Sequence, residues 1–489
     1  MDTLEIFLLT STTAGIILIQ RPVFTKVRLL IGILITALIV ANFIFNGFRW
    51  VIVPILIVGS YVICRSIFLK ESRRHFSLKF LKWSGLSVLL AVAWILPISF
   101  PLFQLPSPTG LYAVGTQWIH LVDSSRDETI TASPLDKREL MAKIWYPTDI
   151  QKGSEDAYLL KSERTGFAQK YGFPDWTLSY LDRVRTHVIT NVDIASGKFP
   201  VLIFSHGYES PATNYYSFLT DIASHGYIIV NINHTYESIS SEFPDGQVRL
   251  RNDSFSVATN LNPKMIELAW NSTEKFNKAK SEEERLQVVT ELVHHYSGST
   301  VVRRWAKDIS FVIDQMELSN KTSNSFLYNK LDLSRLGAFG HSLGGAAAGQ
   351  ALINDSRLLA AANWDGSQFG DVVDTIFQKP FMLLNHSVPL RAGFEINPLV
   401  YHRKSQTWFY DVVVDGTGHS NYSDIPYWIT PKFINEAGEI DMDRGVTIIN
   451  NITLAFFDKH LLKKSISIEN LSKEFIELQI KTSKGEMLK

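Results

Sequence analysis

The sequence contains a single cysteine, Cys64, in 489 residues. One thiol excludes a disulfide framework within the chain and any metal site built from several cysteines. Net charge is also absent, because 48 Lys and Arg residues balance 48 Asp and Glu residues. A chain with no basic stripe is not expected to bind nucleic acid, so we predict no nucleic-acid partner.

Hydrophobic residues are plentiful, at 46% of the chain, and charge is unevenly distributed. The first 104 residues hold ten Lys and Arg against three Asp and Glu, a net charge of +7, so the rest carries −7. Three apolar runs, 29–45, 50–69 and 83–100, approach the roughly 20 residues that span a bilayer, and 4–19 is a weaker fourth. We predict an all-α membrane region of three or four transmembrane helices over residues 1–104. The alternative is a set of buried helices in a large soluble protein.

The basic residues of this region predict its orientation. Two loops hold nearly all of them: Arg21, Lys26 and Arg28 in the first, and Arg65, Lys70, Arg73, Arg74, Lys79 and Lys82 in the second. By the positive-inside rule both loops are cytoplasmic. The sequence therefore predicts a multi-pass protein of the cell membrane, with everything after Phe100 on the extracytoplasmic side.

After residue 104 the hydrophobic pattern changes from long runs to short segments. Alternating segments at 118–123 and 139–147 predict antiparallel strands, and continuous apolar segments predict buried strands at 199–204, 227–232, 359–364, 380–385 and 407–414. Predicted helices lie at 215–224, 299–318 and 446–462. This alternation predicts a mostly parallel, doubly wound sheet over residues 105–465, with a polar tail at 466–489. Residues 237–298 are interpreted as a helical insertion, either a lid or a solvated helical pair.

The segment Gly340-His341-Ser342-Leu343-Gly344 lies between a predicted strand and an alanine-rich predicted helix. A strand, a G-x-S-x-G turn and a small-residue helix form a nucleophile elbow, in which the glycines avoid clashes that a Cβ atom would cause. We therefore predict that Ser342 is a catalytic nucleophile. The alternative is that Ser342 only caps a helix.

A serine nucleophile requires a histidine base and a carboxylate that orients the histidine. His419 follows the last predicted strand on a glycine-rich turn, which is where the histidine is expected. The segment after strand 381–384 offers no carboxylate until Glu395, but Asp365 follows the preceding strand at the same edge of the sheet. We predict Asp365 as the acid and interpret its rival, Asp415, as part of an Asp-Gly turn.

The turn Ser205-His206-Gly207-Tyr208 follows the predicted strand at 199–204. In hydrolases of this architecture such a turn donates a backbone N–H to the oxyanion of the tetrahedral intermediate. We predict that the amides of Tyr208 and Leu343 form the oxyanion hole. The alternative for 205–208 is an ordinary strand-to-helix turn. The neighbouring residues His294 and His295 have no partners at metal-ligand spacing, so no metal is expected there.

Several segments together resemble the plasma-type platelet-activating factor acetylhydrolase family, including its bacterial relatives. They are Pro106 to Thr116, Trp145-Tyr146-Pro147, Phe204-Ser205-His206-Gly207, Gly340 to Gly345, Asp365 and His419. The resemblance covers residues 106–425 and implies an α/β-hydrolase fold. It also implies a calcium-independent serine esterase, without cofactor, that prefers short or oxidised acyl chains on phospholipids. The membrane-spanning N-terminus departs from the secreted pattern of this family.

From the residues and the resemblance we predict a membrane-anchored serine ester hydrolase. Three alternatives remain open. In the first, the substrate is another ester, such as a polyester, a xenobiotic or a cell-envelope ester. In the second, the protein is a membrane sensor that has kept the fold without catalysis. In the third, the N-terminal helices form a transporter. The absence of paired buried charges in the predicted spans argues against this alternative.

Overall fold

The computed structural model describes residues 2–19, 25–68, 76–259, 262–387, 396–401 and 407–484. Two compact units divide the chain. Unit 1 consists of 1–104, 173–184 and 426–435, and unit 2 of 105–172, 185–425 and 436–489. Arg21, Lys70, Arg73 and Arg74, which contributed to the prediction of sidedness, lie outside the described residues.

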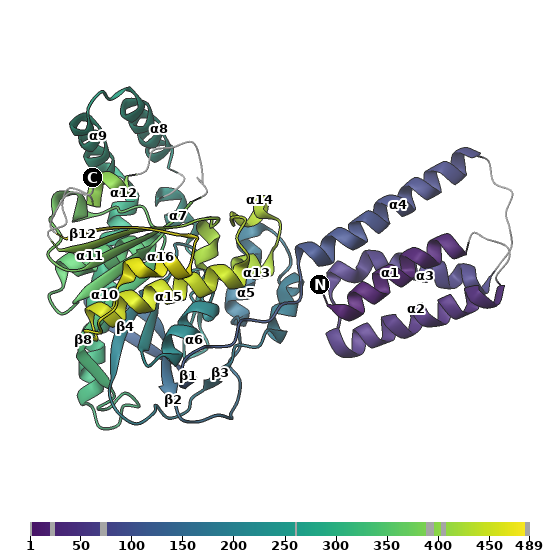
Figure 1. The fold of residues 1–489 in the computed structure, drawn as a ribbon, viewed down its shortest axis with the longest axis horizontal. Helices are drawn as coiled ribbons and strands as arrows, with labels where there is room; N and C mark the ends of the chain where they lie inside the picture. The colour runs from purple at the N-terminus through teal and green to yellow at the C-terminus, as the bar shows by residue number, and fades with distance from the viewer. Residues whose placement is uncertain are drawn as a thin grey trace. The chain divides into compact units, whose positions relative to one another are not determined.

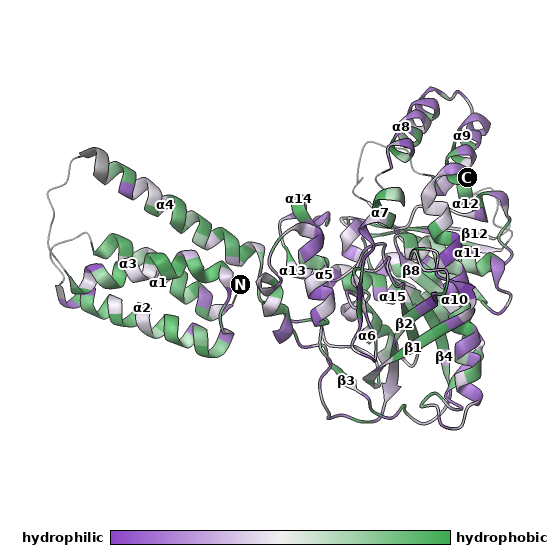
Figure 2. Ribbon diagram, turned by 180° about the vertical axis from the view of Figure 1, so that it is seen from behind, coloured by the Kyte–Doolittle hydropathy of each residue, from purple (hydrophilic) through white to green (hydrophobic). Residues whose placement is uncertain are grey.

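Unit 1 is built around apolar helices (Figure 1). They are α1 (Thr3–Leu18), α2 (Thr25–Asn46), η1 (Trp50–Ile52), α3 (Val53–Ile67) and α4 (Phe76–Ser99). Three helical segments are long and apolar enough to cross a membrane, namely Lys26–Asn46, Trp50–Ile67 and Phe80–Ser99, whereas α1 is shorter. Hydrophobic residues run along all of these helices (Figure 2), and Leu30, Phe45 and Leu81 are each more than 60% exposed.

A buried ion pair joins two segments of unit 1. Arg49 contacts Glu5, and the two side chains are each only 1% exposed. Arg49 also donates a hydrogen bond to the carbonyl of Phe100. The expectation that the spans have no paired buried charges is therefore wrong for α1. Glu5 lies in the first turn of α1 and Arg49 directly precedes η1, so both charges lie at helix ends.

Two further segments of unit 1, 173–184 and 426–435, are distant in sequence from its first 104 residues. They contain η2 (Asp175–Arg183), part of α13 (Ile425–Trp428) and α14 (Lys432–Asn435). Trp50 Nε1 donates to the carbonyl of Thr177 at 2.9 Å, and Tyr180 Oη donates to the carbonyl of Trp428 at 3.1 Å. These hydrogen bonds attach both segments within unit 1.

Unit 2 is organised around a ten-stranded sheet with the order β12-β11-β10-β9-β8-β4-β5-β2-β1-β3. The strands are β1 (Ala113–Asp127), β2 (Lys137–Thr148), β3 (Val188–Thr190), β4 (Phe199–Ser205), β5 (Ile228–Asn233), β8 (Leu331–His341), β9 (Ala360–Trp364), β10 (Phe381–His386), β11 (Trp408–Val414) and β12 (Leu478–Lys484). β1 and β2 are antiparallel, as predicted, while β5, β4, β8, β9, β10 and β11 are mutually parallel.

Helices cover both faces of the sheet (Figure 1). α10 (Ser297–Lys321) packs beside α11 (Leu343–Asn354) on one face, and α6 (Tyr216–Ser224) packs beside α15 (Met442–His460) on the other. Every residue of β4, β5 and β9 is buried, which explains why their sequences are mostly apolar rather than alternating. Because the central strands are parallel, their carboxyl ends lie at one edge of the sheet.

The remaining elements are short or lie between these strands. They are α5 (Lys161–Tyr171), β6 (Ser240–Glu242), β7 (Val248–Leu250), α7 (Asp253–Thr259), α8 (Pro263–Lys278), α9 (Glu282–His295), η3 (Asp371–Asp374), α12 (Asn397–Tyr401), η4 (His419–Tyr422), η5 (Ile468–Asn470) and α16 (Leu471–Glu474). The segment 237–298 thus begins with a β-hairpin before its helices. Residues 478–484, interpreted as part of a polar tail, form β12 against β11, so the sheet extends beyond residue 465.

Candidate active site

The turn between β8 and α11 has the strained geometry expected of a nucleophile elbow. Ser342 has φ 55° and ψ −124°, a conformation that is unfavourable for a residue with a Cβ atom. Its backbone N–H donates to the carbonyl of Trp364 at 2.7 Å, which ties the elbow to β9. A Cβ atom on Gly344 would overlap the carbonyl oxygen of Ser205, and one on Gly340 would overlap the backbone of Gly344. The two glycines allow the elbow to lie directly against the end of β4.

Three side chains from three loops form a hydrogen-bond relay at this edge of the sheet. Ser342 Oγ lies 3.1 Å from His419 Nε2, and His419 Nδ1 lies 2.6 Å from Asp365 Oδ2. A carboxylate only accepts, so Nδ1 of His419 carries the proton and Nε2 is free to accept from the serine hydroxyl. The sequence predicted these three residues, and the structure brings them together with each in hydrogen-bonding distance of the next.

The carboxylate of Asp365 is held by several donors. Asp365 has φ 58°, and its backbone N–H donates to the carbonyl of Leu384 at 2.8 Å. Its Oδ1 accepts from the backbone N–H of His386 at 2.9 Å and from the ring of the same residue. Burial opposes ionisation of this carboxyl group, but the hydrogen bonds from His386 and His419 hold its pKa well below the ordinary value. The acid is therefore ionised at neutral pH.

The rival acid points elsewhere. Asp415 Oδ2 accepts from Gln479 Nε2 at 2.8 Å, and the Asp415 N–H donates to the carbonyl of Glu477, so this residue is bonded to the C-terminal strand segment. Another histidine, His460, pairs with Tyr410 Oη at 3.1 Å. Sequence spacing alone distinguished Asp365 from Asp415 poorly as the acid. In the fold the two residues have different hydrogen-bond partners.

The turn after β4 lies beside the elbow. The Gly207 carbonyl accepts from His206 Nδ1 at 2.7 Å and from the Ser210 N–H at 3.1 Å. In a trans peptide the N–H points away from the carbonyl, so these bonds turn the Tyr208 N–H in the opposite direction. In the described part of the chain, neither the Tyr208 N–H nor the Leu343 N–H has a hydrogen-bond acceptor. A Cβ atom on Gly207 would lie 3.6 Å from Ser342 Cβ, so the turn is adjacent to the serine.

A second Ser-His-Asp arrangement lies in the interior of unit 2. Ser205 Oγ is 2.7 Å from His234 Nε2, and His234 Nδ1 is 2.8 Å from Asp308 Oδ2. All three residues are completely buried, and the ring of Trp305 stacks on His234 with centroids 3.9 Å apart. No substrate can reach this serine hydroxyl without unfolding the surrounding chain. The arrangement is therefore structural, and the accessible Ser342 relay is the candidate site.

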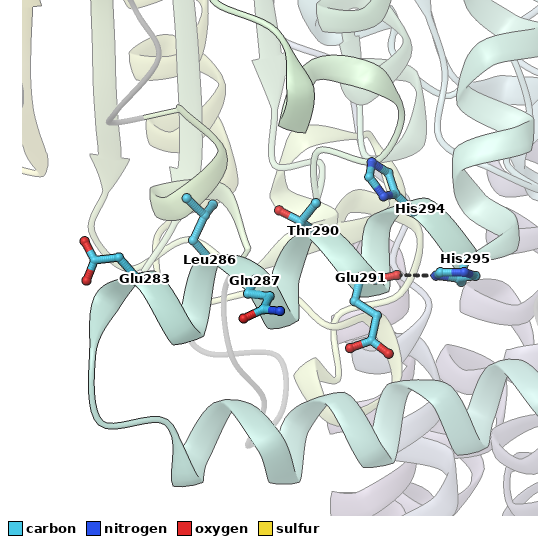
Figure 3. A pocket seen from close by; sticks show the side chains of 7 residues that line it. All are labelled: Glu283, Leu286, Gln287, Thr290, Glu291, His294 and His295. Atoms are coloured by element: carbon cyan, nitrogen blue, oxygen red, sulfur yellow. Dashed lines mark hydrogen bonds between the residues drawn. The ribbon is translucent and has the colours of Figure 1, made fainter.

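Other candidate groups do not form a comparable site. His294 and His295 lie at the end of α9 beside a pocket lined by residues of that helix (Figure 3), and their rings have separate partners. His294 Nε2 is 2.6 Å from Asp374 Oδ2, whereas His295 Nδ1 bonds the carbonyl of Glu291. In the described residues, Asp365, His386 and His419 are close enough to share a metal ion, within 4.8 Å of one another. Their mutual hydrogen bonds already account for this proximity.

The contact between His386 and Asp365 was not predicted from the sequence. His386 ends β10, which pairs in parallel with β9, the strand that leads to Asp365. Neighbouring parallel strands end side by side, so strand adjacency is the signal that could have placed His386 beside the acid. The hydrogen bonds of Tyr215 and His341 had no comparable signal in the sequence.

Comparisons with known proteins support the prediction of family and fold. Residues 98–477 match the family described as platelet-activating factor acetylhydrolase, isoform II. The platelet-activating factor acetylhydrolase of Canis lupus familiaris is 23% identical over 378 residues, covering 73% of this chain and 77% of the relative. A probable 1-alkyl-2-acetylglycerophosphocholine esterase of Arthroderma benhamiae is 25% identical over 299 residues, covering 58% of this chain and 64% of the relative.

A solved structure supports the fold. The ferulic acid esterase from Streptomyces cinnamoneus superposes with a TM-score of 0.60 at 24% identity, covering 78% of this chain and 99% of the esterase. With the ten-stranded mixed sheet, this likeness confirms the predicted α/β-hydrolase architecture. The family match over 98–477 confirms the predicted relationship and the prediction of an enzyme. The chain belongs to the platelet-activating factor acetylhydrolase, isoform II family of ester hydrolases.

Proposed function

We propose that Ser342, His419 and Asp365 form the catalytic triad of this ester hydrolase. The observation that carries the proposal is the continuous relay from Ser342 Oγ through the His419 ring to the Asp365 carboxylate, with distances of 3.1 Å and 2.6 Å. Asp365 holds the imidazole with Nε2 toward the serine and stabilises the imidazolium that forms when His419 takes the proton.

The reaction proceeds by acyl transfer. Ser342 Oγ attacks the ester carbonyl carbon while His419 Nε2 removes the hydroxyl proton, and the resulting oxyanion accepts hydrogen bonds from the Tyr208 and Leu343 amides. His419 then gives the proton to the departing alkoxide oxygen. Water, activated by the same imidazole, attacks the acyl-enzyme and releases the acid. Among the described residues the Tyr208 and Leu343 N–H groups have no acceptor, which supports their assignment to the oxyanion hole.

For the substrate we propose short-chain or oxidised acyl esters of phospholipids. The proposal rests on family membership and on the names of the relatives, one of which is called an esterase of 1-alkyl-2-acetylglycerophosphocholine. A short acyl chain has little apolar surface to bury, so the glycerophospholipid portion supplies the rest of the recognition.

One experiment tests the mechanism and the substrate class together. The full-length protein in detergent should hydrolyse 1-alkyl-2-acetylglycerophosphocholine faster than a long-chain phosphatidylcholine or a feruloyl ester, and a fluorophosphonate should label it covalently. The Ser342→Ala variant should neither hydrolyse nor label, because it lacks the nucleophile. Labelling of Ser342→Ala would contradict the mechanism. Faster cleavage of the feruloyl ester would contradict only the substrate class.

We propose that residues 1–104 anchor the enzyme in the cell membrane and that unit 2 lies on the extracytoplasmic side. Three sufficiently long apolar helices and the exposed apolar side chains of unit 1 support the anchor. The distribution of Lys and Arg in the predicted loops supports the orientation. Anchoring would raise the effective concentration of the enzyme at an amphiphilic ester.

Cysteine accessibility tests this orientation. In a Cys64→Ser background, Lys280→Cys places one thiol in the exposed connection between α8 and α9. A membrane-impermeant maleimide should label this thiol in intact cells, because the connection belongs to unit 2. Labelling that appears only after the cells are lysed would reverse the orientation. Extraction of the full chain by sodium carbonate, which removes peripheral proteins, would contradict the anchor itself.

A further inference from the structure

A chain of hydrogen bonds joins the turn after β4 to the loop that holds His419. The Gly207 N–H donates to Tyr215 Oη at 2.9 Å, and Tyr215 Oη is 3.1 Å from His341 Nδ1. His341 Nε2 is 3.1 Å from the carbonyl oxygen of His419. Tyr215 is completely buried and His341 is 6% exposed, so water does not compete for these bonds.

The direction of every bond in this chain is fixed by chemistry. A carbonyl oxygen only accepts, so His341 Nε2 must carry a proton to bond His419. An amide N–H only donates, so Tyr215 Oη accepts from Gly207 and gives its own proton to His341 Nδ1. Burial, and next the neighbouring His419, lower the pKa of His341 to about 3, so the ring stays neutral in this tautomer.

This chain of hydrogen bonds passes through the three loops on which the proposed reaction depends. At one end it fixes the Gly207 amide, which directly precedes the peptide that presents the Tyr208 N–H. In the middle is His341, which directly precedes Ser342. At the other end it holds the backbone of His419, whose ring also lies 4.6 Å, centroid to centroid, from that of His341. A shift of any one loop would therefore break a hydrogen bond to another.

We propose that Tyr215 and His341 are positioning residues, which hold the oxyanion amide and the catalytic histidine in register about Ser342. This inference rests on the proposed function. In the described residues neither side chain forms a hydrogen bond with Ser342 Oγ or with the His419 ring. Each acts by keeping two other loops at the separation that attack and oxyanion stabilisation require together. Displacements of about 1 Å at an active site commonly cost on the order of 100-fold in rate.

Tyr215→Phe tests the proposal with little change in shape, because it removes only the hydroxyl group. With p-nitrophenyl acetate as substrate, we expect kcat to fall roughly 10- to 100-fold while KM changes less than about threefold. The matched control is Tyr410→Phe, which removes the hydroxyl of another buried tyrosine paired with a histidine, His460. This control should keep the wild-type kcat.

Variants of His341 distinguish positioning from general stability. His341→Gln retains a side-chain N–H that can reach the His419 carbonyl, so it should retain more activity than His341→Leu at equal thermal stability. The double variant Tyr215→Phe with His341→Leu should be no slower than the slower single variant, because both interrupt the same chain. Effects on kcat that multiply in the double variant would overturn the proposal.

A wild-type kcat for Tyr215→Phe would also overturn it, as would a fall in kcat matched by Tyr410→Phe. The proposed function fails in a different way. If Ser342→Ala kept full activity, the triad would be wrong whatever the Tyr215 variant did. If Ser342→Ala is inactive while Tyr215→Phe is unaffected, only the positioning inference is wrong.

Discussion

The Ser342→Ala variant is expected to lose about 10⁶-fold in kcat, the scale on which removal of a triad nucleophile acts in serine hydrolases. In the proposed mechanism the Ser342 hydroxyl oxygen, 3.1 Å from His419 Nε2, forms the acyl-enzyme, so its loss closes the covalent route. The residual rate comes from substrate binding and from the oxyanion amides alone. KM should change little, because the small side chain contributes little to ground-state binding.

Among the carboxylates, Asp365→Asn should reduce kcat by about 10⁴-fold. An amide nitrogen at this position donates to His419 Nδ1, which favours the tautomer with the proton on Nε2 and removes the acceptor that Ser342 needs. Asp415→Asn is the matched control. Its carboxylate bonds Gln479 rather than His419, so the variant should retain wild-type kcat.

Steady-state hydrolysis of p-nitrophenyl acetate by the full-length protein measures all three variants, with thermal unfolding as a check on folding. A large loss for Asp415→Asn together with a small loss for Asp365→Asn would move the acid to the other position. Comparable and large losses for both would indicate that the loop after β11 is distorted in the Asp415 variant, which the unfolding measurement would detect.

The sheet was predictable because the burial of a strand determines its sequence pattern. Strands buried on both faces are continuously apolar, and strands with one solvated face alternate. The continuous apolar run at 199–204 predicted a central strand, and every residue of β4 is buried. The alternating pattern at 118–123 predicted a strand with one solvated face, as in β1. β12 was not predicted, because an edge strand that contacts one neighbour needs few apolar residues and its sequence resembles a solvated tail.

The candidate site was predictable as far as each residue follows a strand. Ser342, Asp365 and His419 each lie after a predicted strand, so the common edge of a parallel sheet brings them together. Tyr215 precedes α6 and reaches the site only through the packing of its side chain. Hydropathy and spacing contain no information on such a contact, and the same is true of the tautomer of His341.

The buried ion pairs of unit 2 also could not be predicted from the sequence. Arg138 is 2% exposed and contacts three carboxylates, Glu128 at 2.9 Å, Glu237 at 3.3 Å and Asp308 at 2.6 Å. These residues lie up to 170 positions apart in the chain. An arginine between a lysine and a glutamate is normally interpreted as solvent-exposed, and only the fold reveals that its partners are buried around it.

Arg138→Met is expected to lower the free energy of unfolding by about 3–5 kcal/mol, because it removes the cation shared by three buried carboxylates while retaining an apolar side chain of similar length. The adjacent Lys137→Met is the matched control. Lys137 and its partner Asp127 are 43% and 66% exposed, so this surface pair should contribute less than about 1 kcal/mol. Denaturation of the full-length protein, followed by tryptophan fluorescence, reports both, since Trp305 stacks on His234 beside the cluster.

The difference in unfolding free energy between wild type and Arg138→Met should decrease as the pH falls. Burial raises the pKa of Asp308, but Arg138 and then His234 more than offset this, so its pKa in the folded protein is well below that of the unfolded chain. A depressed carboxyl pKa stabilises the fold above the unfolded value of about 3.9, and this stabilisation is lost as pH falls below it. Met at position 138 removes the cation that lowers the pKa, so the wild-type advantage should be full near pH 7 and should shrink below about pH 4. An advantage that grows as the solution is acidified would contradict an ionised Asp308 as the partner of Arg138.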